Sequence, residues 1–237
     1  ETLKVFEDPI QGHIYSVIVD TSRGVGNDFS AFVVIDVTQV PYKIVATFRN
    51  NTIAPMLYPK FIVHAAKMYN EASCLIEIND IGAQVADIIH NEYEYEGLIK
   101  AVWKGRAGQI CGGGFGGGDS QLGVRTTSSL KRIGCSSLKT IIENDKLYIS
   151  DFDVLSELTT FVANKRGTNY EAEDGMTDDL AMCLVLFAWL TGQDYFKQLT
   201  DIDIRKNLYQ QNEQAIEDEL LPFGFIDAGS GANVSTD

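Results

Sequence analysis

Four acidic residues stand in segments that are otherwise apolar, and their types and positions could support metal-ion chemistry. They are Asp20, Glu77, Asp178 and Asp179. Asp20 ends a β-branched run, Glu77 interrupts a second such run, and the aspartate pair opens a hydrophobic helix. A carboxylate in a buried element costs free energy unless it is paired or binds a metal ion. Oxygen ligands without histidine suit Mg²⁺ or Mn²⁺ and phosphate chemistry better than they suit zinc.

A purely structural role is the alternative for each acid. An aspartate after a strand is a common turn residue, and an aspartate at the start of a helix commonly serves as its N-cap. Glu77 fits neither role, because the interior of a strand has no helix end to cap. The sequence leaves open which of Asp178 and Asp179 would face a site.

A basic window lies within an acidic chain. The chain carries 19 basic and 33 acidic residues, a net charge of −14, which excludes a uniformly basic protein that coats DNA. Residues 100–140 nevertheless hold seven basic residues against one acidic residue. We expect Lys131 and Arg132 to bind DNA phosphates with little sequence specificity. The further candidates are Arg125, Lys139, Lys104 and Arg106. A solvated face is the alternative interpretation of this window.

Composition excludes several other classes of protein. A hydrophobic fraction of 45% and a mean hydropathy of −0.05 predict a buried core. The four cysteines and three histidines lack the spacing of a zinc site or a disulfide framework. The longest apolar stretch is far shorter than the ~20 residues of a membrane span, and no signal peptide opens the chain. No G-x-x-x-x-G-K-[ST] phosphate loop occurs, so we expect no ATPase site here.

The order of the predicted elements indicates the fold class. Short β-branched runs predict strands at 14–20, 31–37, 43–48, 74–78, 97–103 and 146–149. Apolar spacing predicts helices at 58–69, 81–89, 126–143, 151–164 and 177–192, the second capped by Asn79 and Asp80. Three meandering strands followed by strands alternating with helices predict an α/β fold, with a mixed central sheet and helices on both faces.

Two segments differ in composition from the rest. Residues 105–118 contain eight glycines, so we expect 105–124 to be a Gly-rich mobile loop within a domain that spans 1–193. From Asp194 onward the chain holds nine acidic and three basic residues. We therefore expect 194–237 to be an acidic C-terminal tail, partly disordered.

Four segments in combination resemble the C-terminal nuclease domain of the terminase large subunit of tailed bacteriophages, T-even-like phages in particular. They are GHIYSVIVDTSRGVGNDFSAFVVIDVT (12–38), YNEASCLIEIND (69–80), IGCSSLKTIIENDKL (133–147) and EDGMTDDLAMCLVLFAWL (173–190). The resemblance implies a ribonuclease-H-like fold. It also implies that Asp20, Glu77 and Asp179 are the catalytic, metal-binding acids, with Asp178 as an adjacent candidate. Two Mg²⁺ or Mn²⁺ ions would bind together with substrate. Residues 105–124 resemble an insertion relative to close relatives.

The same resemblance implies a function and partners. The expected activity is endonucleolytic cutting of double-stranded DNA that ends packaging of a phage genome. The implied partners are DNA, the phage portal protein, the small terminase subunit and a packaging ATPase domain N-terminal to this one, in the host cytoplasm and transiently on the procapsid portal. The alternatives are a recombination nuclease or Holliday-junction resolvase, and a non-catalytic portal-docking module. Because all the acids are present, catalysis is favoured.

Overall fold

A mixed β-sheet forms the centre of the molecule, as predicted. The computed structural model describes residues 3–23, 29–102, 110, 120–164 and 170–201. Its main sheet runs in the order β1-β4-β3-β2-β5, with β8 paired to β4. The strands are β1 (Lys4–Val5), β2 (Tyr15–Asp20), β3 (Ser30–Asp36), β4 (Tyr42–Asn50), β5 (Ser73–Ile76) and β8 (Leu147–Tyr148). The meander β2-β3-β4 is antiparallel, whereas β2 and β5 are parallel.

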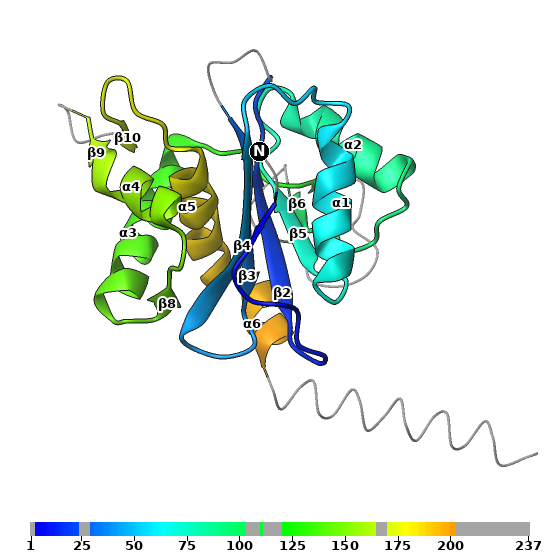
Figure 1. Cartoon of the computed structure of the whole chain (residues 1–237), viewed down its shortest axis with the longest axis horizontal. Coiled ribbons are helices and arrows are strands. Elements are labelled where there is room, and N and C mark those ends of the chain that lie inside the picture. Colours follow the sequence, from blue (N-terminus) through cyan, green and yellow to red (C-terminus); the bar gives the residue numbers. More distant parts are fainter. Residues whose placement is uncertain (1–2, 24–28, 103–109, 111–119, 165–169, 202–237) are drawn as a thin grey trace, which may run out of the picture. The chain divides into compact units, whose positions relative to one another are not determined.

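Helices cover both faces of this sheet (Figure 1). One face carries α1 (Tyr58–Met68) and α2 (Gly82–Asn91). The other carries α3 (Ser128–Glu143), α4 (Phe152–Thr160) and α5 (Asp179–Thr191). All seven residues of β3 are buried, because a sheet covered on both faces needs apolar side chains on both. The predicted fold class is therefore confirmed in its layers.

Two hydrophobic cores follow from the alternation of side chains along the strands. Val17, Val19 and Val34 pack with α1 and α2. Ile18 and Val33 belong to the core of α5, in which twelve of thirteen residues are buried. A helix that is apolar all round must be covered on all sides. Helix α5 accordingly contacts β2 and β3 as well as α3 and α4.

The short helix α6 (Asp194–Thr200) corrects the predicted start of the tail. The described residues up to Thr200 form one compact unit. Phe196 of α6 is buried against Tyr42 and Phe187. The compact unit therefore includes α6 and extends to Thr200, beyond the predicted boundary at residue 193. Beyond Thr200 the structure describes only Asp201, so the predicted disorder of the tail lies outside the described residues.

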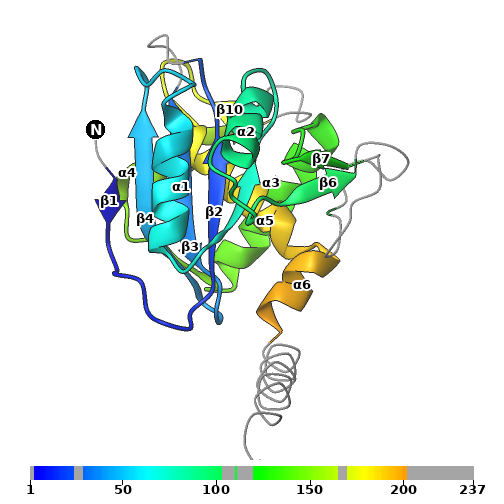
Figure 2. The same ribbon diagram turned by 90° about the vertical axis from the view of Figure 1, so that its right-hand side faces the viewer.

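The Gly-rich loop predicted at 105–124 extends too far at its C-terminal end. Residues 97–99 run beside β5 and lead into β6 (Lys100–Val102), which pairs with β7 (Ser120–Leu122), as Figure 2 shows. Val124 then bonds to Ile76 and Ile78, so residues 120–124 are regular structure and not loop. The residues between β6 and β7 lie, apart from Ile110, outside the described part of the chain.

Two other predictions of local structure were wrong. The helix predicted at 151–164 ends at Thr160, where β9 (Phe161–Ala163) begins and pairs with β10 (Tyr170–Ala172). β-branched and aromatic residues fit this paired conformation better than a helix. Neither Asn79 nor Asp80 caps α2, since the N-cap position is Ile81, without a side-chain cap bond. Among the described residues, no helix is long and apolar enough to span a membrane.

Candidate active site

Sheet topology brings Asp20 and Glu77 together. Because β2 and β5 are parallel neighbours in register, their carboxyl ends meet at one edge of the sheet (Figure 2). Asp20 is the last residue of β2, and Glu77 follows β5 directly. The Glu77 amide donates to Val19 O at 2.9 Å. The two carboxyl groups therefore lie close enough for the charge of Glu77 to act on Asp20.

Asp179 approaches from the first turn of α5. It is buried, and its Oδ1 accepts a hydrogen bond from Phe29 N at 3.1 Å. Burial and the charges of Glu77 and Asp179 raise the pKa of Asp20 well above its usual range. Burial and the charge of Glu157 raise the pKa of Asp179 to about 7. Three acids from distant parts of the sequence therefore converge where their negative charges are unfavourable.

Asp178 points differently from its neighbour. It occupies the N-cap position of α5 without making a side-chain cap bond. Its Oδ2 lies 3.8 Å from Lys131 Nζ. Asp179, not Asp178, contributes to the raised pKa of Asp20. The geometry therefore favours Asp179 as the third acid and pairs Asp178 with the first turns of α3.

The donor set fits a hard divalent cation that keeps part of its water shell. As the described side chains stand, no group of three or more His, Cys, Asp or Glu residues is placed to hold one ion directly. Asn79 donates to Glu77 Oε1 at 3.1 Å, and its own buried Oδ1 has no hydrogen-bond partner. Oxygen donors that repel one another, beside an unsatisfied amide oxygen, suit Mg²⁺ or Mn²⁺, because such ions bind few carboxylates and retain water.

The predicted DNA-binding residues are placed unequally. Lys131 is packed on α3, 16% exposed, between Asp178 and the Phe161 ring. Arg132 is exposed on the same helix, and Arg125 is exposed just before it. Lys139 is exposed and pairs with Glu143 at 3.7 Å. Lys104 and Arg106 lie outside the described residues.

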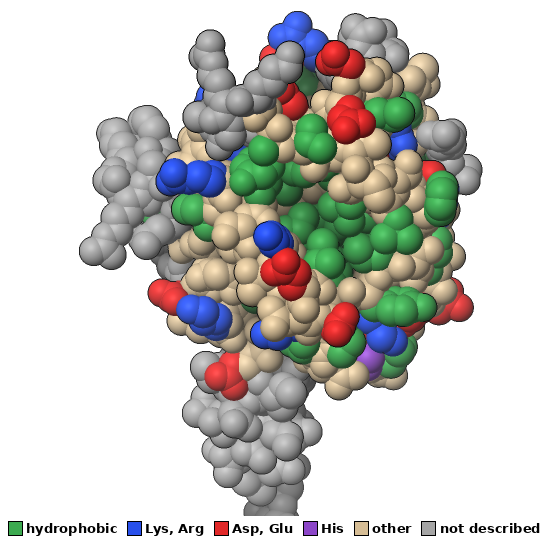
Figure 3. All heavy atoms as spheres, turned by 90° about the vertical axis from the view of Figure 1, so that its left-hand side faces the viewer, with side chains coloured by type: hydrophobic (Ala, Val, Ile, Leu, Met, Phe, Trp, Pro, Cys, Tyr) green, Lys and Arg blue, Asp and Glu red, His purple; other side chains and the backbone are tan. Residues whose placement is uncertain are grey.

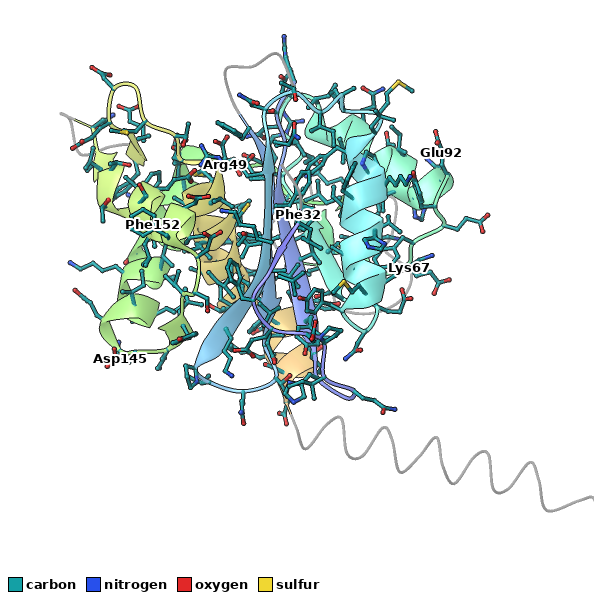
Figure 4. The ribbon with its side chains drawn as sticks, viewed as in Figure 1. Phe32, Arg49, Lys67, Glu92, Asp145 and Phe152 are labelled. Carbon is teal, nitrogen blue, oxygen red and sulfur yellow. The ribbon has the colours of Figure 1, made fainter. Side chains whose placement is uncertain are left out.

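Sequence reasoning missed a network behind Asp179. Glu157 of α4 is buried and lies 3.4 Å from Arg49 Nη1, while Arg49 Nη2 donates to Thr177 Oγ1 at 2.8 Å. Figure 4 shows Arg49 between the sheet and the α4–α5 layer. An acid three residues after the buried Val154, on the inward face of a predicted helix, is the pattern that could have identified Glu157.

An ion pair joins the loop that follows Asp20 to the loop that carries Glu77. Arg23 Nε and Nη2 donate to the two carboxylate oxygens of Asp80 at 2.5 and 2.7 Å. Asp80 adopts a left-handed backbone conformation, with φ of 50°. Both side chains are exposed, so the pair contributes little to stability. It does link the segments that follow β2 and β5.

Comparison with known proteins gives the family. The family model described as the terminase RNaseH-like domain matches residues 17–187, more than half of the chain. Similar solved structures include the large terminase nuclease of thermophilic phage G20c with bound magnesium, with a TM-score of 0.60 and 20% identity over 80% of this chain and 87% of that one. The same G20c nuclease with bound zinc has a TM-score of 0.57 and 19% identity, over 82% and 90%.

A third similar structure is the large terminase nuclease domain of Thermus phage P74-26, with a TM-score of 0.55 and 21% identity over 78% and 84% of the two chains. At these identities the structures support the fold. The matched phages are thermophilic, so a T-even-like origin stays a prediction. On the family match, this chain belongs to the terminase RNaseH-like domain family.

Proposed function

We propose that this domain is a Mg²⁺- or Mn²⁺-dependent endonuclease that cuts double-stranded DNA during packaging of a phage genome. The observation that carries the proposal is the convergence of Asp20, Glu77 and Asp179 at one edge of the sheet, in a chain of the terminase nuclease family. The acids come from β2, from the residue after β5 and from the start of α5. A bound cation would offset the mutual repulsion of these carboxylates, so the cluster favours cation binding.

The proposed reaction is an in-line displacement at a backbone phosphorus. Bound Mg²⁺ or Mn²⁺ would activate a water molecule and stabilise charge on the leaving 3′-oxygen. Asp20, between Glu77 and Asp179, would hold both of two ions. Glu77 and Asp179 would each hold one, and Asp178 is the adjacent candidate. Because carboxylic acids must lose their protons to ligate a metal, cation binding would release the protons that the raised pKa values retain.

Cations of the chain would hold the DNA backbone. Arg132 and Arg125 are exposed on and before α3, and Lys131 lies beside Asp178 at the start of the same helix. Contacts of this kind carry little sequence information. We therefore expect cutting with little sequence preference. The portal protein, the small terminase subunit and an ATPase domain of the same full-length protein are the proposed partners, in the host cytoplasm.

Plasmid cleavage tests the proposal. Wild type and Asp20→Asn would be incubated with supercoiled DNA in Mg²⁺, in Mn²⁺ and in EDTA. We expect nicked and linear products from the wild type in either metal, and none from the variant or in EDTA. Four-way junctions and linear duplexes of equal length serve as the second comparison. Cleavage by folded Asp20→Asn, or activity confined to junctions, would contradict the proposal.

A further inference from the structure

Glu157 is a buried acid whose carboxylate is fully occupied by protein groups. Its Oε2 accepts hydrogen bonds from Leu180 N at 2.7 Å and from Ala181 N at 3.0 Å. Its Oε1 accepts one from Thr177 Oγ1 at 3.1 Å. A buried charge with this many partners is held in one orientation. Glu157 is therefore fixed to the first turn of α5.

These bonds cap α5 from another helix. The first N–H groups of a helix lack partners within it, and an acid at this end is favoured by the helix dipole. Asp178, at the N-cap position, makes no side-chain cap bond. Glu157 replaces it in that role. The carboxylates of Asp178 and Asp179 consequently do not cap their own helix.

Arg49 connects this cap to the main chain beside Asp179. Its guanidinium carbon lies 3.8 Å from the centroid of the Phe29 ring, and the Phe29 amide donates to Asp179 Oδ1. The same guanidinium contacts Glu157 and Thr177. Contacts therefore reach Asp179 from two directions, through the backbone of Phe29 and through the capped turn of α5.

We propose that Glu157 and Arg49 are positioning residues, which hold the first turn of α5 so that Asp179 presents its carboxylate toward Asp20 and the divalent cation. This role rests on the proposed function and deepens it. Neither residue needs to touch the substrate or the metal ion. Partners that orient a ligand commonly change metal affinity or activity by about 10- to 100-fold when they are lost.

Glu157→Gln is the primary test, because glutamine keeps the size and one acceptor oxygen while it loses the charge and the second oxygen. In the wild type, Mn²⁺ should raise the melting temperature, since a ligand that binds the folded state stabilises it. We expect the Mn²⁺ concentration for half of this shift to rise about tenfold in Glu157→Gln. The Mg²⁺ midpoint for plasmid cleavage should rise similarly, whereas DNA affinity in Ca²⁺ should change less than about twofold.

Glu92→Gln is the matched control. Glu92 is an exposed acid at the end of α2, on the opposite side of the sheet from α4 (Figure 4). The control should match the wild type in melting temperature shift and in cleavage. Arg49→Lys is the second test variant, since it keeps the positive charge but loses the planar fork and the stacking on Phe29. It should shift both metal midpoints in the same direction as Glu157→Gln, by a smaller factor.

The outcomes separate the two proposals. A wild type that cuts no DNA in either metal would overturn the proposed function. A wild type that cuts, together with metal midpoints unchanged in Glu157→Gln and Arg49→Lys, would overturn the positioning role alone. A lower melting temperature and weaker DNA binding, with unchanged Mn²⁺ midpoints, would also overturn the positioning role. A purely structural role predicts that pattern. If Glu157→Gln does not fold, Arg49→Lys decides between these outcomes.

Discussion

The carboxyl groups of Asp20, Glu77 and Asp179 repel one another unless protons or cations neutralise them. This repulsion yields a prediction about function and stability together. Asp20→Asn, Glu77→Gln and Asp179→Asn should each abolish plasmid cleavage, because each removes a proposed ligand. Without metal, each variant should be at least as stable as the wild type, since a buried like charge is lost.

Cleavage assays and urea unfolding in EDTA measure these two effects. The exposed Asp87→Asn on α2 is the control, and it should match the wild type in both assays. Wild-type cleavage rates from folded Glu77→Gln would show that the site is wrongly assigned. A large loss of stability in Asp179→Asn would show instead that this acid serves the fold, through its bond from Phe29.

The raised pKa of Asp179 predicts how the metal-free stability depends on pH. An acid whose pKa is raised from near 4 to about 7 on folding binds its proton more tightly in the folded state. Its contribution is fully present below pH 4 and is lost as pH rises through about 7. The loss is on the order of 4 kcal/mol at most.

Urea unfolding in EDTA at pH 5 and pH 8.5 measures this loss. The wild type should lose more stability between these pH values than Asp179→Asn does, because asparagine does not titrate. Saturating Mg²⁺ should reduce the difference, since a cation replaces the proton. Equal pH dependence in both proteins would mean that Asp179 titrates normally.

At the scale of secondary structure, α2 packs so closely against the residue after β5 that one methyl group added at its start should disturb the site. A Cβ at Gly82 would lie 1.9 Å from Glu77 O and 2.7 Å from Thr21 Oγ1. Gly82→Ala must therefore displace the main chain of Glu77. We expect cleavage to fall by up to about 100-fold, because small misplacements of catalytic groups are costly.

The exposed Gln84→Ala on the same helix is the control for Gly82→Ala, and circular dichroism verifies that both variants are folded. Cleavage by folded Gly82→Ala at the wild-type rate would mean that the segment after β5 tolerates movement without effect on Glu77. Reduced DNA binding with unchanged maximal rate would point to an effect on the DNA path instead.

We expect the two adjacent basic residues of α3, Lys131 and Arg132, to have different roles. Arg132 is exposed, so Arg132→Ala should weaken DNA binding and lower the slope of log affinity against log salt by about one contact. Lys131 lies beside Asp178, so Lys131→Ala should also lower the maximal cleavage rate. Salt titrations on two unrelated duplexes distinguish these effects. A loss limited to one sequence would contradict phosphate binding.

The sequence was sufficient for the elements that local patterns determine. The β-branched runs of β2 and β3 and the apolar helix α5 occur where predicted, so Asp20 and Asp179 could be placed at element ends. Glu77 was predicted inside a strand, whereas β5 ends at Ile76 and Glu77 follows it. The roles of Asn79 and Glu157 could not be predicted. Asn79 bonds to Glu77 and to Thr126 O, and Glu157 caps a helix that begins 22 residues later. Both roles depend on contacts that exist only after the chain has folded.

The end of α4 and the turn before α2 illustrate the same limit. Phe161 leaves the helix because Tyr170–Ala172 offers a pairing partner. Asp80 pairs with Arg23 across the two loops and so does not cap α2. Local propensity fixes which residues can form a strand or a cap, and tertiary partners decide which of these options is used.

At the scale of the whole molecule, charge and apolar surface are distributed unevenly. The net charge of −14 opposes DNA binding, so the isolated domain should bind DNA weakly and depend on its local cations. Figure 3 shows hydrophobic side chains gathered on the face of α3 and α4. Ile142, Tyr148, Phe152 and Leu155 are among the exposed apolar residues of these elements and of β8.

The extent of the folded unit gives the last prediction. Helix α6 adds the buried Phe196 to the core, at centroid distances of 5.9 Å from both Tyr42 and Phe187. Burying a phenylalanine contributes about 1.5–3 kcal/mol, and aromatic pairs add about 0.5–1.5 kcal/mol. A chain ending at residue 193 should therefore be less stable than one ending at Thr200 by roughly 2–4 kcal/mol.

Urea unfolding of the two truncated chains measures this difference, and Phe196→Ala in the full chain should reproduce most of it. Lys197→Ala, an exposed change on the same helix, should leave stability within about 0.5 kcal/mol of the wild type. Phe196 contacts α5 at Phe187, whereas Asp179 is the first residue of that helix. Mg²⁺ should therefore still stabilise the shorter chain. Equal stability of the two truncated chains would instead support a domain boundary at residue 193, as predicted from the composition of the sequence.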